Sequence, residues 1–201
     1  MSNKNIIVAI LSKSAAGKDT IARYLSSQGF KYVVSTTSRP MRSNETNHED
    51  YHFVTYDEFV KKLNNHEFIE YRNYNTIQEN KNVTWHYGIE SNEIDLTKQS
   101  HVCVVDIVGL KDLEKHFGNK ILSIYLDVDE KSRRTRAIAR DRNFEEAEWI
   151  RRNADDDIKF EKIGDNATMV KNYNLDECIE EILLEIENYK TMGQFFEECY
   201  G

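Results

Sequence analysis

The stretch from residue 5 to residue 20 holds the residues whose types and spacing point most directly to chemistry. An apolar run, 6–11, leads into a turn of small residues and then into Gly17-Lys18. The run predicts a strand buried on both faces, and apolar residues at helical spacing after Lys18 predict a helix. In such a turn, backbone N–H groups converge and bind phosphate oxygens, and a lysine adds a point charge for the β- and γ-phosphates. We therefore interpret this stretch as a phosphate-binding loop.

This loop departs at two positions from the common pattern G-x-x-x-x-G-K-[ST]. Ser12 stands where the first glycine is expected, which is tolerable if its φ angle is negative. Asp19 stands where a Mg²⁺-binding hydroxyl is expected, and Thr20 follows one place later. Asp19 either holds Mg²⁺ through water or weakens triphosphate binding by repulsion, and the sequence leaves both open. An ordinary strand-to-helix turn is the alternative interpretation of the whole stretch.

Two arginines three residues apart, Arg39 and Arg42, form a second candidate site. Pro40, the only proline in the chain, stiffens the backbone between them. Guanidinium groups donate paired hydrogen bonds to phosphate or carboxylate, so the segment is typical of an anion clamp. The alternative is a solvated arginine pair on a surface turn.

Composition limits what else the chain can be. Its 201 residues, 39% apolar and 31% charged, are enough for one domain with a substantial core. No stretch approaches the roughly 18 apolar residues of a membrane span, and we expect no secretion signal. The net charge of −8 argues against a nucleic-acid or anionic-membrane surface. Three widely spaced cysteines form no metal-ligand cluster and indicate a reducing compartment, so we expect a cytoplasmic protein.

Strand-like and helix-like segments alternate along the chain, which predicts an α/β fold with a parallel sheet and ligands at the carboxyl ends of its strands. The polar segment 35–95 differs from this pattern, and we interpret it as an inserted lobe. The predicted strands are 6–11, 31–34, 68–74, 101–106, 120–127 and 166–170. The predicted helices are 18–28, 57–63, 89–96, 109–116, 145–159 and 176–189, with one more from about Glu130 that Asp129 can cap.

Residues 35–53 closely resemble the nucleotide-binding segment of guanylate kinases. That family has a serine, an arginine four places on, a second arginine three further and a tyrosine nine beyond, and this spacing is matched by Ser35, Arg39, Arg42 and Tyr51. The likeness continues to about Tyr189 through Glu67 to Glu70, Tyr87-Gly88, Asp106 with Gly109, Arg136 with Arg140, and Asn172. It therefore covers nearly the whole chain.

The resemblance implies roles for these residues. Those implied to bind ATP are Ser14, Ala15, Ala16, Gly17, Lys18, Asp19, Thr20 and Asn172, with Asp19 also holding Mg²⁺ through water. Those implied to bind GMP are Ser35, Arg39, Arg42, Tyr51, Glu70, Tyr87 and Asp106. Glu70 suits guanine because a carboxylate accepts hydrogen bonds from both N1–H and the 2-amino group. Those implied to act on the transferring phosphoryl group are Lys18, Arg136, Arg140 and Arg152, although the spacing also allows Arg151 instead of Arg152.

The fold implied by the resemblance is a P-loop kinase fold, a parallel sheet flanked by helices with an inserted nucleoside-monophosphate-binding lobe and a helical lid. It would divide the chain into a core (1–34, 96–135 and 160–190), the lobe (35–95), a lid (about 136–159) and a tail (191–201). The implied activity is transfer of the γ-phosphoryl group of ATP to GMP or dGMP, with Mg²⁺ accompanying ATP. The implied partners are these nucleotides. We expect no nucleic acid and no membrane as partners, and we expect a monomer or a homodimer.

Two other functions stay open. Ile89 stands where the family has a hydroxyl that helps bind guanine, which leaves room for a broader deoxynucleoside monophosphate kinase. The other is a non-catalytic guanylate-kinase-like binding module, although such modules lose loop and clamp residues that remain here. The acidic run 155–157 looks like a metal cluster, but we interpret it as a solvated charge run on a helix.

Overall fold

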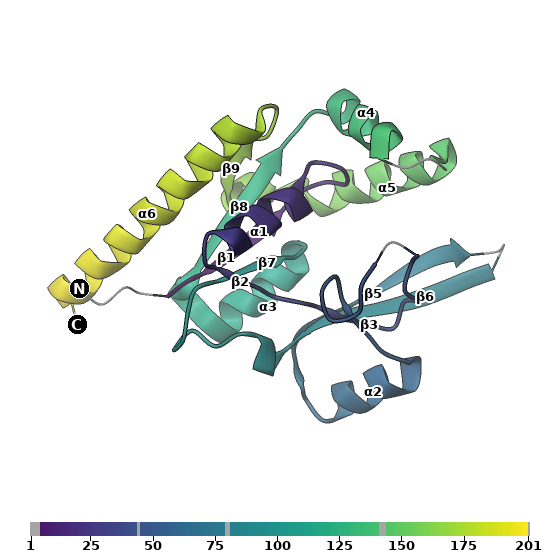
Figure 1. Ribbon diagram of the computed structural model, residues 1–201, viewed down its shortest axis with the longest axis horizontal. Helices are drawn as coiled ribbons and strands as arrows, with labels where there is room; N and C mark the ends of the chain where they lie inside the picture. Colours follow the sequence, from purple (N-terminus) through teal and green to yellow (C-terminus); the bar gives the residue numbers. More distant parts are fainter. Residues whose placement is uncertain (1–4, 44, 79–80, 141–143, 201) are drawn as a thin grey trace.

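The computed structural model describes residues 5–43, 45–78, 81–140 and 144–200. Its centre is a five-stranded parallel sheet in the order β2-β7-β1-β8-β9, with β1 in the middle (Figure 1). The strands are β1 (Ile7–Leu11), β2 (Lys31–Tyr32), β7 (His101–Val104), β8 (Ile121–Asp127) and β9 (Thr168–Lys171). The α/β fold with a parallel sheet, predicted from the alternation of strands and helices, is confirmed.

Every residue of β1 is buried, so both faces of this sheet must be covered, and helices cover them. Successive strand residues point to opposite faces, so Ile10 joins one core cluster and Leu11 joins the other. The first cluster includes residues of α1 (Lys18–Ser27) and α6 (Leu175–Tyr200), and the second includes residues of α3 (Ile107–Phe117). The apolar run 6–11 therefore contains the predicted strand, and this strand is buried on both faces.

The segment predicted to be a lid, about 136–159, contains the end of α4 (Glu130–Arg140) and all of α5 (Glu146–Lys159) (Figure 1). Asp129 caps α4 as predicted, because its Oδ1 accepts a hydrogen bond from the Ser132 amide at 2.8 Å. Trp149 of α5 is buried, and the Arg133 guanidinium of α4 lies 5.6 Å from the centre of its ring. This cation–π contact joins the two helices.

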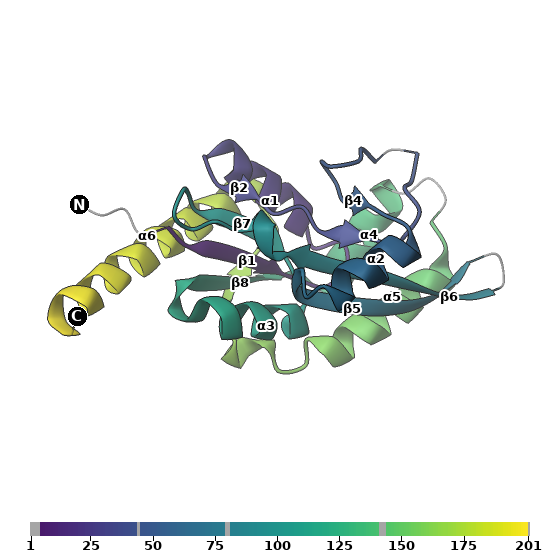
Figure 2. The same cartoon turned by 90° about the horizontal axis from the view of Figure 1, so that it is seen from below.

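A second, four-stranded sheet lies in the segment predicted to be an inserted lobe. Its order is β4-β3-β6-β5, formed by β3 (Thr36–Thr37), β4 (His52–Phe53), β5 (Phe68–Gln78) and β6 (Lys81–Glu90). The antiparallel pair of β5 and β6 extends from the end of the molecule opposite to α6 (Figure 2). Helix α2 (Tyr56–Asn64) begins with a reciprocal capping box between Thr55 and Glu58. The boundaries of the core, lobe, lid and tail stay predictions.

Two predicted elements are wrong. The predicted helix 89–96 does not form: Ile89 is the last but one residue of β6, and only a 3₁₀ turn, η1 (Ser91–Glu93), follows it. A β-branched residue buried in the sheet favours the strand. The last helix continues to Tyr200 instead of ending at 189, because Gly193 alone does not terminate a helix. Two further 3₁₀ turns are η2 (Gly118–Lys120) and η3 (Ile163–Asp165).

Among the described residues, no helix combines the length and the apolar character that crossing a membrane requires.

Candidate active site

The loop between β1 and α1 has the geometry of a phosphate-binding loop. Gly17 is the N-cap of α1, with a φ of 101° in the left-handed region that favours glycine. A Cβ atom on Gly17 would lie 2.6 Å from Asn172 Nδ2, so close packing requires glycine as well. Ser12 does not adopt a positive φ, and its departure from the expected glycine adds no backbone strain. Ala15 does adopt one, with a φ of 63°, and this strain was not foreseen from the sequence.

Side chains from the far end of the chain hold this loop. The Ala16 carbonyl accepts hydrogen bonds from Asn172 Nδ2 at 2.7 Å and from Arg136 Nη1 at 3.2 Å. The Ser14 carbonyl accepts one from Arg133 Nη1 at 3.2 Å. Asn172, implied by the resemblance to bind ATP, is thus buried against the loop and holds its shape. Arg133 supports the loop in the same way but was not singled out in the sequence, because nothing local marks a buried arginine.

The acidic run on α5 contacts the loop directly. Asp156 Oδ2 accepts a hydrogen bond from the Ser14 amide at 2.6 Å, and Asp157 Oδ1 lies 2.5 Å from Lys13 Nζ. The interpretation of this run as a solvated face is therefore wrong for Asp156, while Asp157 keeps an exposed side chain and Asp155 pairs with Lys159 of its own helix. A carboxylate on the Ser14 amide indicates that this amide faces a position suited to an anion.

Two clefts, with volumes of about 580 and 610 Å³, adjoin at the loop. They share four lining residues, Lys18, Arg42, Tyr51 and Tyr87. The first also brings together residues from the loop, the clamp and the lid, namely Ala15, Gly17, Asp19, Thr20, Arg39, Arg136 and Arg140. The second contains Ser14, Ser35, Glu70, Asp106 and Arg152. The predicted site residues therefore converge, apart from Ala16 and Asn172, which are buried beside the loop.

The arginine clamp is built around a buried guanidinium. Arg39 is only 4% exposed and makes a paired contact with Glu45, at 2.7 and 3.0 Å, while its Nε donates to Tyr87 Oη at 3.2 Å. The ring of Tyr51 lies 5.4 Å from the Arg39 guanidinium carbon. Glu45 also accepts a hydrogen bond from the Arg42 amide at 2.8 Å. Burial acts to raise the pKa of Glu45, but the hydrogen bonds from Arg39 and Arg42 outweigh it and lower the pKa. The solvated-pair alternative is thereby excluded for Arg39.

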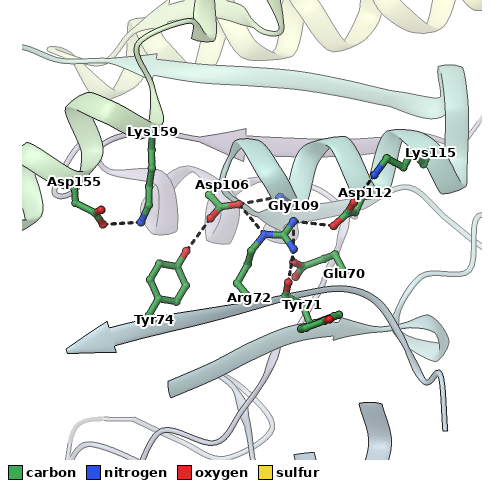
Figure 3. A network of polar contacts seen from close by, with 10 residues as sticks. All are labelled: Glu70, Tyr71, Arg72, Tyr74, Asp106, Gly109, Asp112, Lys115, Asp155 and Lys159. Atoms are coloured by element: carbon green, nitrogen blue, oxygen red, sulfur yellow. Dashed lines mark hydrogen bonds and ion pairs between the residues drawn. The ribbon is translucent and has the colours of Figure 1, made fainter. Parts of the chain in front are cut away.

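The second cleft contains a polar network that joins β5 to α3 (Figure 3). Asp106 is the N-cap of α3, where its carboxylate accepts from the Gly109 amide at 2.8 Å and from Tyr74 Oη at 2.9 Å. Glu70 is 7% exposed, and burial raises its pKa to about 7, with Arg72 opposing the shift. Arg72 and Tyr74 were missed in the sequence, although a strand period of two places both on the face of Glu70.

The lid arginines Arg151 and Arg152 both line the second cleft, and both bind Glu148, with their Nε atoms at 2.7 and 2.6 Å from its oxygens. The choice of Arg152 over Arg151 therefore stays a prediction.

Within the described residues, no three His, Cys, Asp or Glu side chains are grouped to hold a metal ion. Asp19 and Thr20 do offer carboxylate and hydroxyl oxygens to the first cleft, beside Lys18. Oxygen donors suit Mg²⁺, which takes few protein ligands when it binds together with phosphates. These two residues fit a nucleotide-bound Mg²⁺ better than a site formed by protein alone.

A family model described as guanylate kinase matches residues 3–189. The chain belongs to the guanylate kinase family. It is 32% identical to a guanylate kinase of Bacteroides fragilis over 136 residues, which are 64% of this chain and 63% of that protein. The match thus spans less than two thirds of the length of that relative, and it spans 60% of the one from Bacteroides thetaiotaomicron. A guanylate kinase of Salinibacter ruber is 28% identical over 94% of this chain and 98% of its own.

The fold is also that of a solved guanylate kinase. The crystal structure of the enzyme from Anaplasma phagocytophilum superposes with a TM-score of 0.68, covering 94% of this chain and 88% of that one at 19% identity. Ile89, which stands where the guanylate kinase pattern has a hydroxyl, is not among the residues that line the two clefts. Its side chain is fully buried in the core cluster that includes Leu110 and Cys103, and it pairs across the strands with Glu70.

The strain at Ala15 yields a stability prediction. Ala15→Gly should raise the free energy of unfolding by about 0.5–1 kcal/mol, because relief of a left-handed alanine outweighs the extra entropy of an unfolded glycine. Urea denaturation of both forms measures this. Ala16→Gly is the matched control: Ala16 is buried without a positive φ, so the same change there should destabilise the protein. Equal losses in the two variants would contradict strain at Ala15.

Proposed function

We propose that this protein transfers the γ-phosphoryl group of ATP to GMP or dGMP, giving GDP or dGDP. The observation that carries the proposal is the junction of the two clefts, where Lys18 of the loop and Arg42 and Tyr51 of the clamp line both. Phosphoryl transfer needs a donor and an acceptor phosphate held in line, with cations around the moving group. The loop with Lys18 would hold the phosphates of the donor, and the clamp beside it would hold the phosphate of the acceptor, which supports that geometry.

On the donor side, the loop amides of residues 14–17 and Lys18 would bind the ATP phosphates. Asn172 and Arg136 support the loop through the Ala16 carbonyl, so their proposed contribution includes holding these amides in place. Arg136, Arg140 and Arg152 would bring guanidinium donors to the equatorial oxygens of the transferring group. Closure of α4 and α5 over the clefts would exclude water and limit hydrolysis of ATP.

The divalent cation is proposed to be Mg²⁺ accompanying ATP, held by Asp19 with Thr20 beside it. When bound, it would neutralise charge on the β- and γ-phosphates. The carboxylate of Asp19 replaces the usual hydroxyl by a stronger hard-oxygen donor, which supports this role.

On the acceptor side, Arg39, Arg42, Tyr51 and Tyr87 would bind the monophosphate. Glu45 already occupies part of the Arg39 fork, so a phosphate must compete with a carboxylate there. A phosphate has more charge and more acceptor oxygens, and it is the stronger partner. Ser35, Glu70 and Asp106 line the neighbouring cleft and would bind guanine.

The proposed partners are these nucleotides, with no nucleic acid and no membrane, and the proposed location is the cytoplasm. The net charge of −8 and the two buried cysteines, Cys103 and Cys178, support this. We propose a monomer or a homodimer.

One observation favours a second candidate, a broader deoxynucleoside monophosphate kinase. Ile89 brings no hydroxyl to the base-side cleft, which would reduce discrimination among bases. A coupled assay with ATP, Mg²⁺ and the monophosphates GMP, dGMP, IMP, AMP, CMP and dTMP separates the two. Preference for GMP and dGMP supports the proposal, similar rates with all six support the broader kinase, and no turnover supports a binding module.

Lys18 should be essential for turnover. In the same assay Lys18→Ala should lower kcat about 100-fold or more, because it removes a charge that stabilises the migrating phosphoryl group. Lys98→Ala is the matched control, since Lys98 is exposed and pairs only with Asp95 among the described residues. Near-normal turnover by Lys18→Ala would mean that the loop does not bind the transferring phosphate.

Arg42 should act on the acceptor. Arg42→Met keeps an apolar stem and removes a charge-assisted donor, so the KM for GMP should rise about tenfold or more while the KM for ATP changes little. Steady-state kinetics with each substrate varied in turn gives both values. Equal increases in the two KM values would place Arg42 outside the acceptor site.

Glu70 should make the reaction pH-dependent. Its pKa is raised to about 7 by burial, so below neutral pH one carboxyl oxygen carries a proton and no longer accepts a hydrogen bond. The kcat/KM for GMP should therefore increase roughly tenfold between about pH 6 and pH 8. Glu70→Gln is the control, because glutamine does not titrate. Its kcat/KM should depend on pH only through the ionisation of the substrate phosphate near pH 6. Identical pH profiles for the two proteins would exclude Glu70 as the titrating group.

A further inference from the structure

Arg72 is a half-buried cation in the second cleft, and none of the roles that the guanylate kinase resemblance implies falls on it. It lies on β5, two residues after Glu70 and on the same face, and its side chain is 16% exposed. Both residues line the second cleft together with Asp106 (Figure 3). An arginine at this depth must be held by partners, and these partners determine which way its N–H groups point.

Three carboxylates surround the guanidinium. Arg72 Nε donates to Asp106 Oδ1 at 3.3 Å, and Nη2 donates to Asp112 Oδ2 at 3.0 Å. Its Nη1 donates to the Tyr71 carbonyl. Glu70 Oε2 lies 3.7 Å from Nη2, too far for a hydrogen bond but close enough for an ion pair. Of the five N–H donors of an arginine, three therefore have partners among the described residues.

Two of these partners belong to α3 or to its N-cap, and each of them is held in turn by other groups. Asp106 is fixed by Tyr74 and by the Gly109 amide, while Asp112 does not line the cleft and pairs with Lys115 on the outer side of α3. A Cβ atom on Gly109 would lie 3.5 Å from Arg72 Nη2, so α3 packs directly against the guanidinium. Arg72 is thus fixed from α3, with the carboxylate of Glu70 next to it.

We propose that Arg72 is a specificity-determining residue that donates a hydrogen bond to the 6-oxo group of the acceptor base. The inference rests on the proposed function. The edge of guanine presents two donors, the 2-amino group and N1–H, followed by one acceptor, O6. Glu70 presents two acceptor oxygens, and the N–H groups of Arg72 lie directly beside them. The pair Glu70–Arg72 therefore complements a 6-oxopurine along its whole edge.

The same pair opposes adenine. Adenine presents a donor at position 6 and an unprotonated nitrogen at N1, so donor would face donor at Arg72 and acceptor would face acceptor at Glu70. Ile89, directly across the strands from Glu70, has no hydroxyl to offer to the base. Arg72 compensates for this departure from the family pattern by a charge-assisted donor on the neighbouring strand.

The test measures kcat/KM for GMP, IMP, AMP and 2-aminopurine riboside 5′-monophosphate, which keeps the 2-amino group but lacks O6. In Arg72→Met, the preference for GMP over the 2-aminopurine nucleotide should fall about 10- to 100-fold relative to the unmutated protein. The 2-aminopurine nucleotide also lacks N1–H, but this difference from GMP affects the unmutated protein and Arg72→Met alike. Comparing the preference of the one protein with that of the other therefore isolates the contact between Arg72 and O6. The preference for GMP over IMP should not change, because both bases carry O6.

Asp112→Asn is the matched control. It removes an ion pair of Arg72 outside the cleft and should leave the preference for GMP over the 2-aminopurine nucleotide within about threefold of its original value. If Arg72 merely ties β5 to α3, Asp112→Asn should reproduce the effect of Arg72→Met, and all four nucleotides should lose kcat/KM equally. Either result overturns the proposal. Thermal unfolding of each variant identifies a loss of folding. Arg72→Gln, which keeps a polar side chain but removes the charge, then replaces Arg72→Met, and the same preference should fall.

Calorimetric titration of the same four nucleotides separates this inference from the proposed function. If the unmutated protein binds GMP without phosphorylating it, the proposed function fails, and the binding preferences still test Arg72. If it phosphorylates GMP and Arg72→Met keeps the full preference for the 6-oxo base, Arg72 is not a specificity residue although the proposed function holds. If it binds none of the four, both fail.

Discussion

The parallel pairing of β1 with β7 and β8 is the constraint on which the site depends. All five residues of β1 are buried, so the strand is fixed in the middle of the sheet and both of its neighbours run in the same direction. Parallel strands end at one edge. The loop after β1 and the cap residue Asp106 after β7 therefore emerge side by side, and the Val105 amide donates to the Ile10 carbonyl at 3.2 Å where they separate. The two clefts adjoin because these two strand ends do.

Electrostatics then determines how the cations are kept in place. Although the chain has a net charge of −8, guanidinium groups line both clefts, and several of them pair with carboxylates of the same chain. Arg39 binds Glu45, Arg72 binds Asp106, and Arg152 binds Glu148. Such pairing orients the donors of all three arginines, and it stabilises the buried cation of Arg39. It also means that an incoming phosphate exchanges one anionic partner for a stronger one, which favours a dianionic phosphate over weaker anions at the clamp.

Features that depend on short-range patterns could be predicted from the sequence. The loop before Lys18 and the spacing from Ser35 to Tyr51 are short-range patterns, and the structure brings them to one place. A role that depends on a distant partner could not be predicted in this way. Nothing near Asp156 indicates that its carboxylate meets the Ser14 amide, 142 residues earlier. Arg72 lies between these cases, because the strand period places it beside Glu70 but only the fold brings α3 against it.

The surroundings of Glu70 explain its raised pKa. Residues directly across antiparallel strands share a face, and both Ile89 and Glu70 are buried. Burial raises the pKa of Glu70, and the positive charge of Arg72 limits that rise. Without Arg72, the pKa of Glu70 would be higher and its neutral form, a poorer acceptor for two base donors, would be more favoured. Arg72 therefore serves both halves of the proposed recognition: it favours the carboxylate form of Glu70, and it supplies the donor that a carboxylate cannot.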